Sequence, residues 1–329
     1  TFPNATGNVA VFTAAPAAAI ADGSNGQVLT TNGSGVLSFS DMASGADLYA
    51  ANESSPSAQP SATGTNAIAI ADSATASTTH AIAIGHGAKA LGGDRAMALG
   101  RSYASGEDAF AAAIDDITGT HGAKAQHAVA IGKEALADGN SSLALGRDAT
   151  ATSGVYPTAI GRAYSSGDDS LAAAIASNSS SYGATGANSI AIGYQAKATT
   201  SKSIAIGAET LASGFDSSIS IGWQNSATSS RSAAVIGGRG NASSGEYSTV
   251  IGGQDNTASG NHSIASGYEA KATIKGQKVH ASGQFAAKGD AQGSTFILRA
   301  DTTDATATVL TTNNSTASTD NQIIAASDT

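Results

Sequence analysis

Cysteine is absent from this chain of 329 residues, which excludes disulfide bonds and thiolate chemistry but does not identify a compartment. Aromatic residues make up 5% and charged residues 12% of the sequence, so the composition is not that of an ordinary globule. No apolar run approaches the ~18–20 residues of a membrane helix, and no secretory signal pattern is visible. The formal net charge of −9 argues against nucleic-acid binding, which normally needs a basic surface.

Glycine, alanine, serine and threonine dominate instead, and one short pattern recurs among them. Apolar-Ala-apolar-Gly returns every fourteen or fifteen residues, for example at 82–85 and 204–207. A fixed short period indicates one small unit stacked many times. One unit cannot fold alone, because burying an isoleucine contributes ~1.5–3 kcal/mol while ordering each residue costs ~1–2 kcal/mol. Stability must therefore come from stacking and from association between chains.

The residue that closes each pattern serves as an anchor for the unit. The early anchors are spaced by 14, 15, 13 and 19 residues, and the same series then repeats, which defines a block of 61 residues. We expect the two longest steps to carry insertions near 115–126 and 176–187. Both should bulge from the same face of the stack, one 61-residue block apart. The anchors are Ala71, Gly85, Gly100, Ala113, Gly132, Gly146, Gly161, Ala174, Gly193, Gly207, Gly222, Gly237, Gly252, Gly267 and Gly283.

The segment before each anchor alternates large and small apolar residues, which is the period of a β-strand. A strand with two apolar faces must be covered on both sides. We expect alanine to line a narrow interior and the large residues to pack against sister chains. A second segment, such as Ala88-Lys89-Ala90, alternates alanine inward with a polar residue outward. The large residues predicted to hold the trimer together are Ile82, Ile84, Val129, Ile131, Leu143, Leu145, Ile190, Ile192, Ile204, Ile206, Ile219 and Ile221.

These patterns resemble the head repeats of trimeric autotransporter adhesins of the YadA type. The residues that carry the resemblance are Ser203–Gly207 with Ala196–Ala198 before them, and Ser248–Gly260. The resemblance covers about 64–290. It implies an all-β fold, a left-handed parallel β-roll built as a solenoid of coils of 14–15 residues. It also implies a homotrimer, in which three rolls associate side by side or intertwined around a threefold axis.

The flanks of the repeats resemble other proteins. The segment 26–39 predicts a hairpin over 27–40 around Asn32-Gly33-Ser34-Gly35, and it resembles segments near the start of bacteriophage tail-fibre and other virion proteins. The segment 293–312 resembles fibres of marine and cyanobacterial phages. We therefore expect an N-terminal β region for attachment over 1–61 and a β-roll rod over 62–290. A C-terminal β segment over 291–329 is expected to continue beyond the rod.

The residue after each anchor forms a column at a turn, where side chains are expected to be exposed. Among its members, Arg101, Lys133, Arg147, Arg162, Tyr194, Trp223 and Tyr268 are candidates for contact with an anionic or sugar-rich receptor surface. The alternative is a solvated turn that tolerates long side chains, although a turn has no packing need for Trp223, the only tryptophan. The full column is His86, Arg101, Lys133, Arg147, Arg162, Tyr194, Ala208, Trp223, Gly238, Gly253, Tyr268 and Gln284.

Two further patterns raise the question of a metal. His80, His127 and His262 share a column five residues before their anchors, where a threefold axis could bring like histidines together. The same column also holds residues as different as Arg95 and Lys202, which indicates an exposed loop. Paired acids at 107–108 and 168–169 could bind calcium, but their surroundings are not repeated, which favours solvated acids. We predict no metal and no cofactor.

Catalytic patterns are missing as well. The sequence has no Gly-x-Ser-x-Gly elbow, phosphate loop or zinc helix motif. A spike that cleaves polysaccharide needs two carboxylates placed around a sugar, and coils this short leave little room for such a groove. We therefore predict that the chain is not an enzyme.

The combined prediction is a structural and adhesive fibre of a virus particle, which is extracellular and projects toward the host cell. Its expected partners are two sister chains, other virion proteins at the N-terminal end, and a glycan or protein of the host surface, with no nucleic acid and no membrane insertion. The alternatives are the head of a secreted trimeric adhesin on a bacterial surface, a polysaccharide-cleaving tailspike, and a fibre that decorates a capsid.

Overall fold

The structure is a computed structural model that describes residues 27–31, 37–41, 58–176, 179–229, 231–318 and 321. The chain divides into two compact units, 1–52 and 53–329. In the first unit, β1 (Gln27–Thr31) pairs antiparallel with β2 (Leu37–Asp41), so that Gln27 lies opposite Asp41. The sequence predicts a hairpin at this place. The rest of the predicted attachment region before residue 58 lies outside the described residues.

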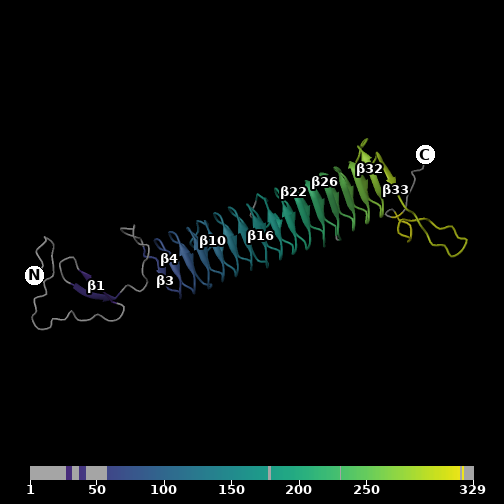
Figure 1. Cartoon of the computed structure of the whole chain (residues 1–329). Coiled ribbons are helices and arrows are strands. Elements are labelled where there is room, and N and C mark those ends of the chain that lie inside the picture. The colour runs from purple at the N-terminus through teal and green to yellow at the C-terminus, as the bar shows by residue number, and fades with distance from the viewer. Residues whose placement is uncertain are drawn as a thin grey trace, which may run out of the picture. The chain divides into compact units, whose positions relative to one another are not determined.

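The second unit is a parallel β-solenoid, and the part that the structure describes contains strands and no helix (Figure 1). Each coil contributes one strand to each of two sheets. The sixteen-stranded sheet consists of β4 (Ile68–Ile70), β6 (Ile82–Ile84), β8 (Met97–Leu99), β10 (Phe110–Ala112), β12 (Val129–Ile131), β14 (Leu143–Leu145), β16 (Thr158–Ile160), β18 (Leu171–Ala173), β20 (Ile190–Ile192), β22 (Ile204–Ala208), β24 (Ile219–Trp223), β26 (Ala234–Arg239), β28 (Thr249–Gln254), β30 (Ile264–Tyr268), β32 (Lys278–Ser282) and β33 (Gln292–Thr295).

The fifteen-stranded sheet is built from shorter strands on the other side of each coil. It consists of β3 (Ser61–Ala62), β5 (Thr75–Ala76), β7 (Lys89–Ala90), β9 (Tyr103–Ala104), β11 (Gly122–Ala123), β13 (Leu136–Ala137), β15 (Thr150–Ala151), β17 (Tyr164–Ser165), β19 (Gly183–Ala184), β21 (Lys197–Ala198), β23 (Leu211–Ala212), β25 (Ser226–Ala227), β27 (Ala242–Ser243), β29 (Thr257–Ala258) and β31 (Lys271–Ala272).

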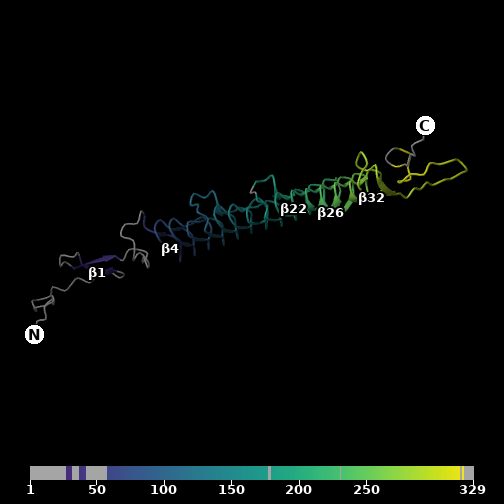
Figure 2. The same ribbon diagram turned by 90° about the horizontal axis from the view of Figure 1, so that it is seen from above.

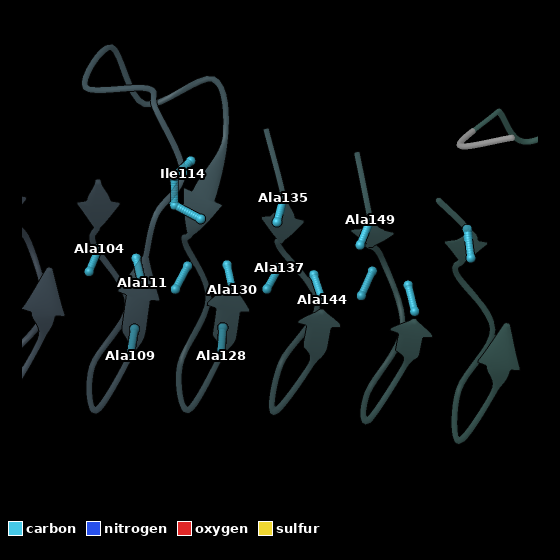
Figure 3. Close-up of a cluster of buried hydrophobic side chains, with 14 of the residues drawn as sticks. Ala104, Ala109, Ala111, Ile114, Ala128, Ala130, Ala135, Ala137, Ala144 and Ala149 are labelled. Carbon is cyan, nitrogen blue, oxygen red and sulfur yellow. The ribbon is translucent and has the colours of Figure 1, made fainter. Parts of the chain in front are cut away.

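The interior between the two sheets is packed with alanine, as the alternation predicts. Ala83 from β6 and Ala88 and Ala90 beside and within β7 are fully buried. Figure 3 shows the methyl groups of successive coils pointing into the same narrow space. Ile114 and Ile175 are the largest side chains in this core, and each belongs to a coil that carries an insertion. A core of methyl groups holds the two sheets close together, which explains why coils of fourteen residues suffice.

The outer face of the sixteen-stranded sheet carries the large apolar side chains that flank each buried alanine. All twelve residues predicted for the trimer contact lie here, half-buried or exposed, and outside the alanine core. Ile84 is 39% and Leu145 is 41% exposed. In-register parallel pairing places like residues above one another, as with Ile190, Ile204 and Ile219. The single chain therefore presents an apolar band along the sheet.

The two insertions lengthen the first turn of their coils. One runs from Ala113 to His121, between β10 and β11, and the other lies between β18 and β19. The predicted bounds of 115–126 and 176–187 extend too far, because β11 and β19 already pair with their neighbours inside them. Figure 2 shows both loops projecting from the same side of the solenoid, as expected for a block repeat.

The predicted anchor Gly283 of the last coil is wrong. Gly267 pairs with Ala281, so Ala281 is the final anchor, and Gly283 lies beyond the strand ladder. β33 then turns back and pairs antiparallel with β32. The Gln292 side chain covers the edge of β31: its Oε1 accepts from the Lys271 N–H at 2.8 Å, and its Nε2 donates to the Lys271 carbonyl at 2.9 Å. An amide group thus takes the place of a further strand at this edge.

Candidate binding surface

The turn after each anchor directs one side chain outward. At Gly146 φ is +123°, a conformation that suits glycine, and Asp148 two residues later is left-handed with φ of 57°. Arg147 between them is exposed. The seven candidate residues, Arg101, Lys133, Arg147, Arg162, Tyr194, Trp223 and Tyr268, are all exposed at this turn. We call the line of residues that follow the anchors the post-anchor row.

The basic half of the row is largely paired with acids. Arg101 Nη1 and Lys133 Nζ lie 3.1 Å and 3.7 Å from the two oxygens of Asp115. Arg147 and Arg162 each place Nε 3.5 Å from Oδ2 of Asp148. Lys133 also lies 3.8 Å from Glu134. Four cations therefore face three carboxylates, and such exposed pairs contribute little to stability. This half of the row is close to neutral rather than strongly basic.

The insertion after β10 supplies Asp115 and is held by its neighbour Asp116. The Asp116 carboxylate accepts hydrogen bonds from the Thr118 backbone at 2.7 Å and side chain at 2.6 Å, and from the His121 backbone at 2.8 Å. Desolvation by burial alone would raise the pKa of Asp116, but these hydrogen bonds outweigh it and lower the pKa to about 2. The loop therefore depends on an ionised carboxylate at its base.

The second half of the row differs from the prediction at three positions. Trp223 pairs with Arg239, Arg239 with Gln254, and Gln254 with Tyr268. The column assignment of Gly238 and Gly253 is therefore wrong, and Gln284 is wrong too, because Tyr268 pairs with Ser282. β26 and β28 each contain a double glycine and hold one extra residue there, which shifts the register with the neighbouring strands β24 and β30 by one position.

A ladder of buried asparagines supports these turns. Asn225, Asn241 and Asn256 are at most 1% exposed and stack on successive coils. The Asn241 amide donates to the carbonyls of Gly237 at 3.2 Å and Gly253 at 3.0 Å. Its side-chain oxygen accepts the backbone N–H of Asn256 at 2.9 Å. Because buried polar groups need partners, the ladder specifies one conformation for the turns beneath the row.

Arg239 lies over the ring of Trp223, with its guanidinium carbon 4.2 Å from the ring centroid. This is the range of a cation–π contact. Sequence reasoning from the anchors missed Arg239 and Gln254. A signal was present: three residues separate Gly222 from Ser226, whereas four separate Gly237 from Ala242. Counting backward from the second strand places Arg239 beside Trp223.

The three histidines of one column lie at the opposite turn, in left-handed conformations with φ between 55° and 60°. His127 lies 3.7 Å from Asp108, and His262 stacks against Tyr247 at 5.3 Å. The acids Glu107 and Asp108 both bind Arg95, which lowers the pKa of Asp108. Among the described residues, no group of three or more histidines and acids is arranged to hold a metal ion.

Parts of the solenoid match a known family model. The YadA head domain repeat matches residues 62–88, 76–102, 123–149, 184–210, 243–270 and 258–275. The coils are similar to YadA head repeats. In general, YadA head domains form homotrimers, and YadA-type adhesins are extracellular and surface-exposed, so these repeats indicate an adhesin-like fibre. No curated protein matches the chain. In the ranges that the structure describes, no helix has the length and apolarity of a membrane span.

Proposed function

We propose that this chain forms the rod of a homotrimeric attachment fibre, which projects from a surface and contacts a cell through exposed side chains. The observation that carries the proposal is the apolar outer face of the sixteen-stranded sheet, which repeats from coil to coil. Large exposed apolar patches are typical of interaction sites, and trimers are the general state of YadA head domains. The proposed role is mechanical and adhesive, not catalytic.

The proposed carrier of the fibre is a virus particle, with other virion proteins at the N-terminal end and a glycan or protein of the host surface as receptor. This part rests on the resemblance of the flanks to phage fibres. A bacterial surface is the second candidate carrier, and the observation in its favour is the repeat itself, because YadA-type adhesins are surface-exposed.

Light scattering of the purified chain tests the assembly. We expect three times the chain mass of 31.9 kDa, and a mass of one chain at micromolar concentration would contradict the proposal. Saturable binding of the fluorescently labelled fibre to host cells tests adhesion, with heat-unfolded fibre as the control. Gold-labelled antibodies then locate the fibre, on the tail or capsid of particles or on the cell envelope. Incubation with host polysaccharide should leave its viscosity unchanged.

A further inference from the structure

Four side chains on neighbouring coils form one exposed strip toward the C-terminal end of the solenoid. They are Trp223, Arg239, Gln254 and Tyr268, the last residues of β24, β26, β28 and β30. We call them the Trp223 strip. All four are exposed, and Trp223 is 45% exposed although it is the largest side chain in the molecule. Because strands lie about 4.8 Å apart, the strip is straight and about 14 Å long.

The strip presents flat groups with hydrogen-bonding edges. Its members are an indole, a guanidinium, an amide and a phenol, and acids and amides border them. Gln224 donates to Glu209 at 2.8 Å, and Gln254 donates to Asp255 at 2.9 Å. These hydrogen bonds fix the orientation of side-chain donors and acceptors beside the Trp223 ring, over which Arg239 lies. Trp, Tyr and Arg are also the residues that most often dominate binding energy at interfaces.

Three backbone carbonyls of the strip are already hydrogen-bonded within the solenoid. The carbonyls of Trp223, Arg239 and Gln254 accept N–H groups of Gly240, Asp255 and Glu269 at 2.9–3.0 Å. The asparagine ladder holds the adjoining turns. An extended peptide that binds by adding a strand needs a free main-chain edge, and the strip lies within the sheet rather than at its edge. Recognition here must use side chains.

The charges around the Trp223 strip restrict the chemical class of its ligand further. Arg239 is the one cation of the strip. The bordering carboxylates are Asp255 and Glu269, which directly follow Gln254 and Tyr268, and Glu209, which accepts a hydrogen bond from Gln224 next to Trp223. This excess of negative charge disfavours a sulfated or uronic polymer. An uncharged sugar satisfies the remaining conditions, because its C–H face packs on the exposed flat groups of the strip while its hydroxyls pair with amides, carboxylates and guanidinium. The strand spacing is also close to the length of one pyranose unit in an extended chain.

From these observations we infer that the Trp223 strip binds an extended, uncharged glycan of the β-1,4-linked type, about three sugar units at a time. The inference rests on the proposed attachment function and names the chemical class of its receptor. The basic half of the post-anchor row lacks the aromatic groups for this contact and stays outside the site.

The single tryptophan makes the site directly observable. Emission of Trp223 in the full chain is followed during titration with cellohexaose. Maltohexaose serves as a helically bent control and a heparin hexasaccharide as an anionic control. We expect a saturable change with cellohexaose and at least tenfold weaker binding of both controls. By calorimetry, Arg239→Ala and Tyr268→Ala should each weaken cellohexaose binding about tenfold. Tyr247→Ala, at the opposite turn and 47% exposed, should leave it unchanged.

The inference is overturned by no response to cellohexaose, by tighter binding of heparin or maltohexaose, or by equal losses in the Tyr247→Ala control. It is also overturned if a proline-rich peptide binds the strip in place of the sugar. Binding of Trp223→Ala fibres to cells separates it from the proposed function. If wild type and variant adhere equally, the strip assignment is wrong and adhesion stands. If cellohexaose binds but no fibre adheres to cells, the strip assignment stands and the attachment function fails.

Discussion

A Cβ atom placed on Gly146 would lie 2.9 Å from the Cα of Gly161 on the next coil. Neighbouring anchors are therefore in closer contact than any side chain allows. The close approach explains why glycine closes so many units: it lets the turns of successive coils stack at the spacing of the strands.

Gly146→Ala should consequently destabilise the rod by about 2 kcal/mol or more, because it combines backbone strain at φ of +123° with overlap against the next coil. Gly161→Ala is the matched control: its φ is +75°, but a Cβ there meets nothing closer than 3.9 Å. It should cost only the strain, about 1 kcal/mol. Thermal unfolding followed by circular dichroism checks both variants, and equal losses would contradict the stacking explanation.

Leu145→Lys should break the trimer while leaving the coils folded, because it places a charge in the middle of the proposed apolar contact. Thr150→Lys in the same coil is the control. Thr150 lies on the outer face of the other sheet, in a column that already holds Lys89 and Lys197. Light scattering should give the mass of one chain for Leu145→Lys and of three for Thr150→Lys. A trimer in both cases would place the interface elsewhere.

Asn241→Ala should destabilise the turns that the asparagine ladder supports by about 2 kcal/mol, because it leaves buried backbone groups without partners. Hydrogen exchange at the Asn256 amide is the direct readout, since that N–H loses its acceptor. Asn261→Ala, which removes an exposed asparagine, is the control. Unchanged protection of Asn256 would show that the ladder is dispensable.

The insertion that contains Asp116 should loosen in acid. Its pKa is lowered to about 2 from an unfolded value near 4. The stability that the ionised group contributes is therefore complete above pH 4 and is lost as the pH falls through 2. Carboxyl carbon NMR should give the low pKa, and amide exchange at Thr118 and His121 should accelerate below pH 3. Asp116→Asn should show fast exchange at all pH values, whereas Asp115→Asn should retain the acid transition.

The solenoid was predictable because its signals are local. Alternation in the segment Ile82–Ile84 places Ala83 inside and both isoleucines outside, and the structure confirms this arrangement. The insertions were predictable in place but not in length, because Gly122 and Gly183 look like turn residues. Pairing with the following coil, opposite Leu136 and Lys197, nevertheless draws both into strands. The post-anchor row was predictable where the turns have constant length and failed where β26 and β28 add a residue.

The coil, its two strands, its alanine interior and its apolar outer face can all be read from the sequence, because each follows from a period of two within a few residues. Which side chains become neighbours across coils depends on the three-dimensional stacking. Arg239 lies on Trp223 because hydrogen bonding between coils, and not distance from the anchor, sets the register. A single added glycine within β26 or β28 is absorbed by a local register shift, and the residues before and after it remain paired with the neighbouring strands.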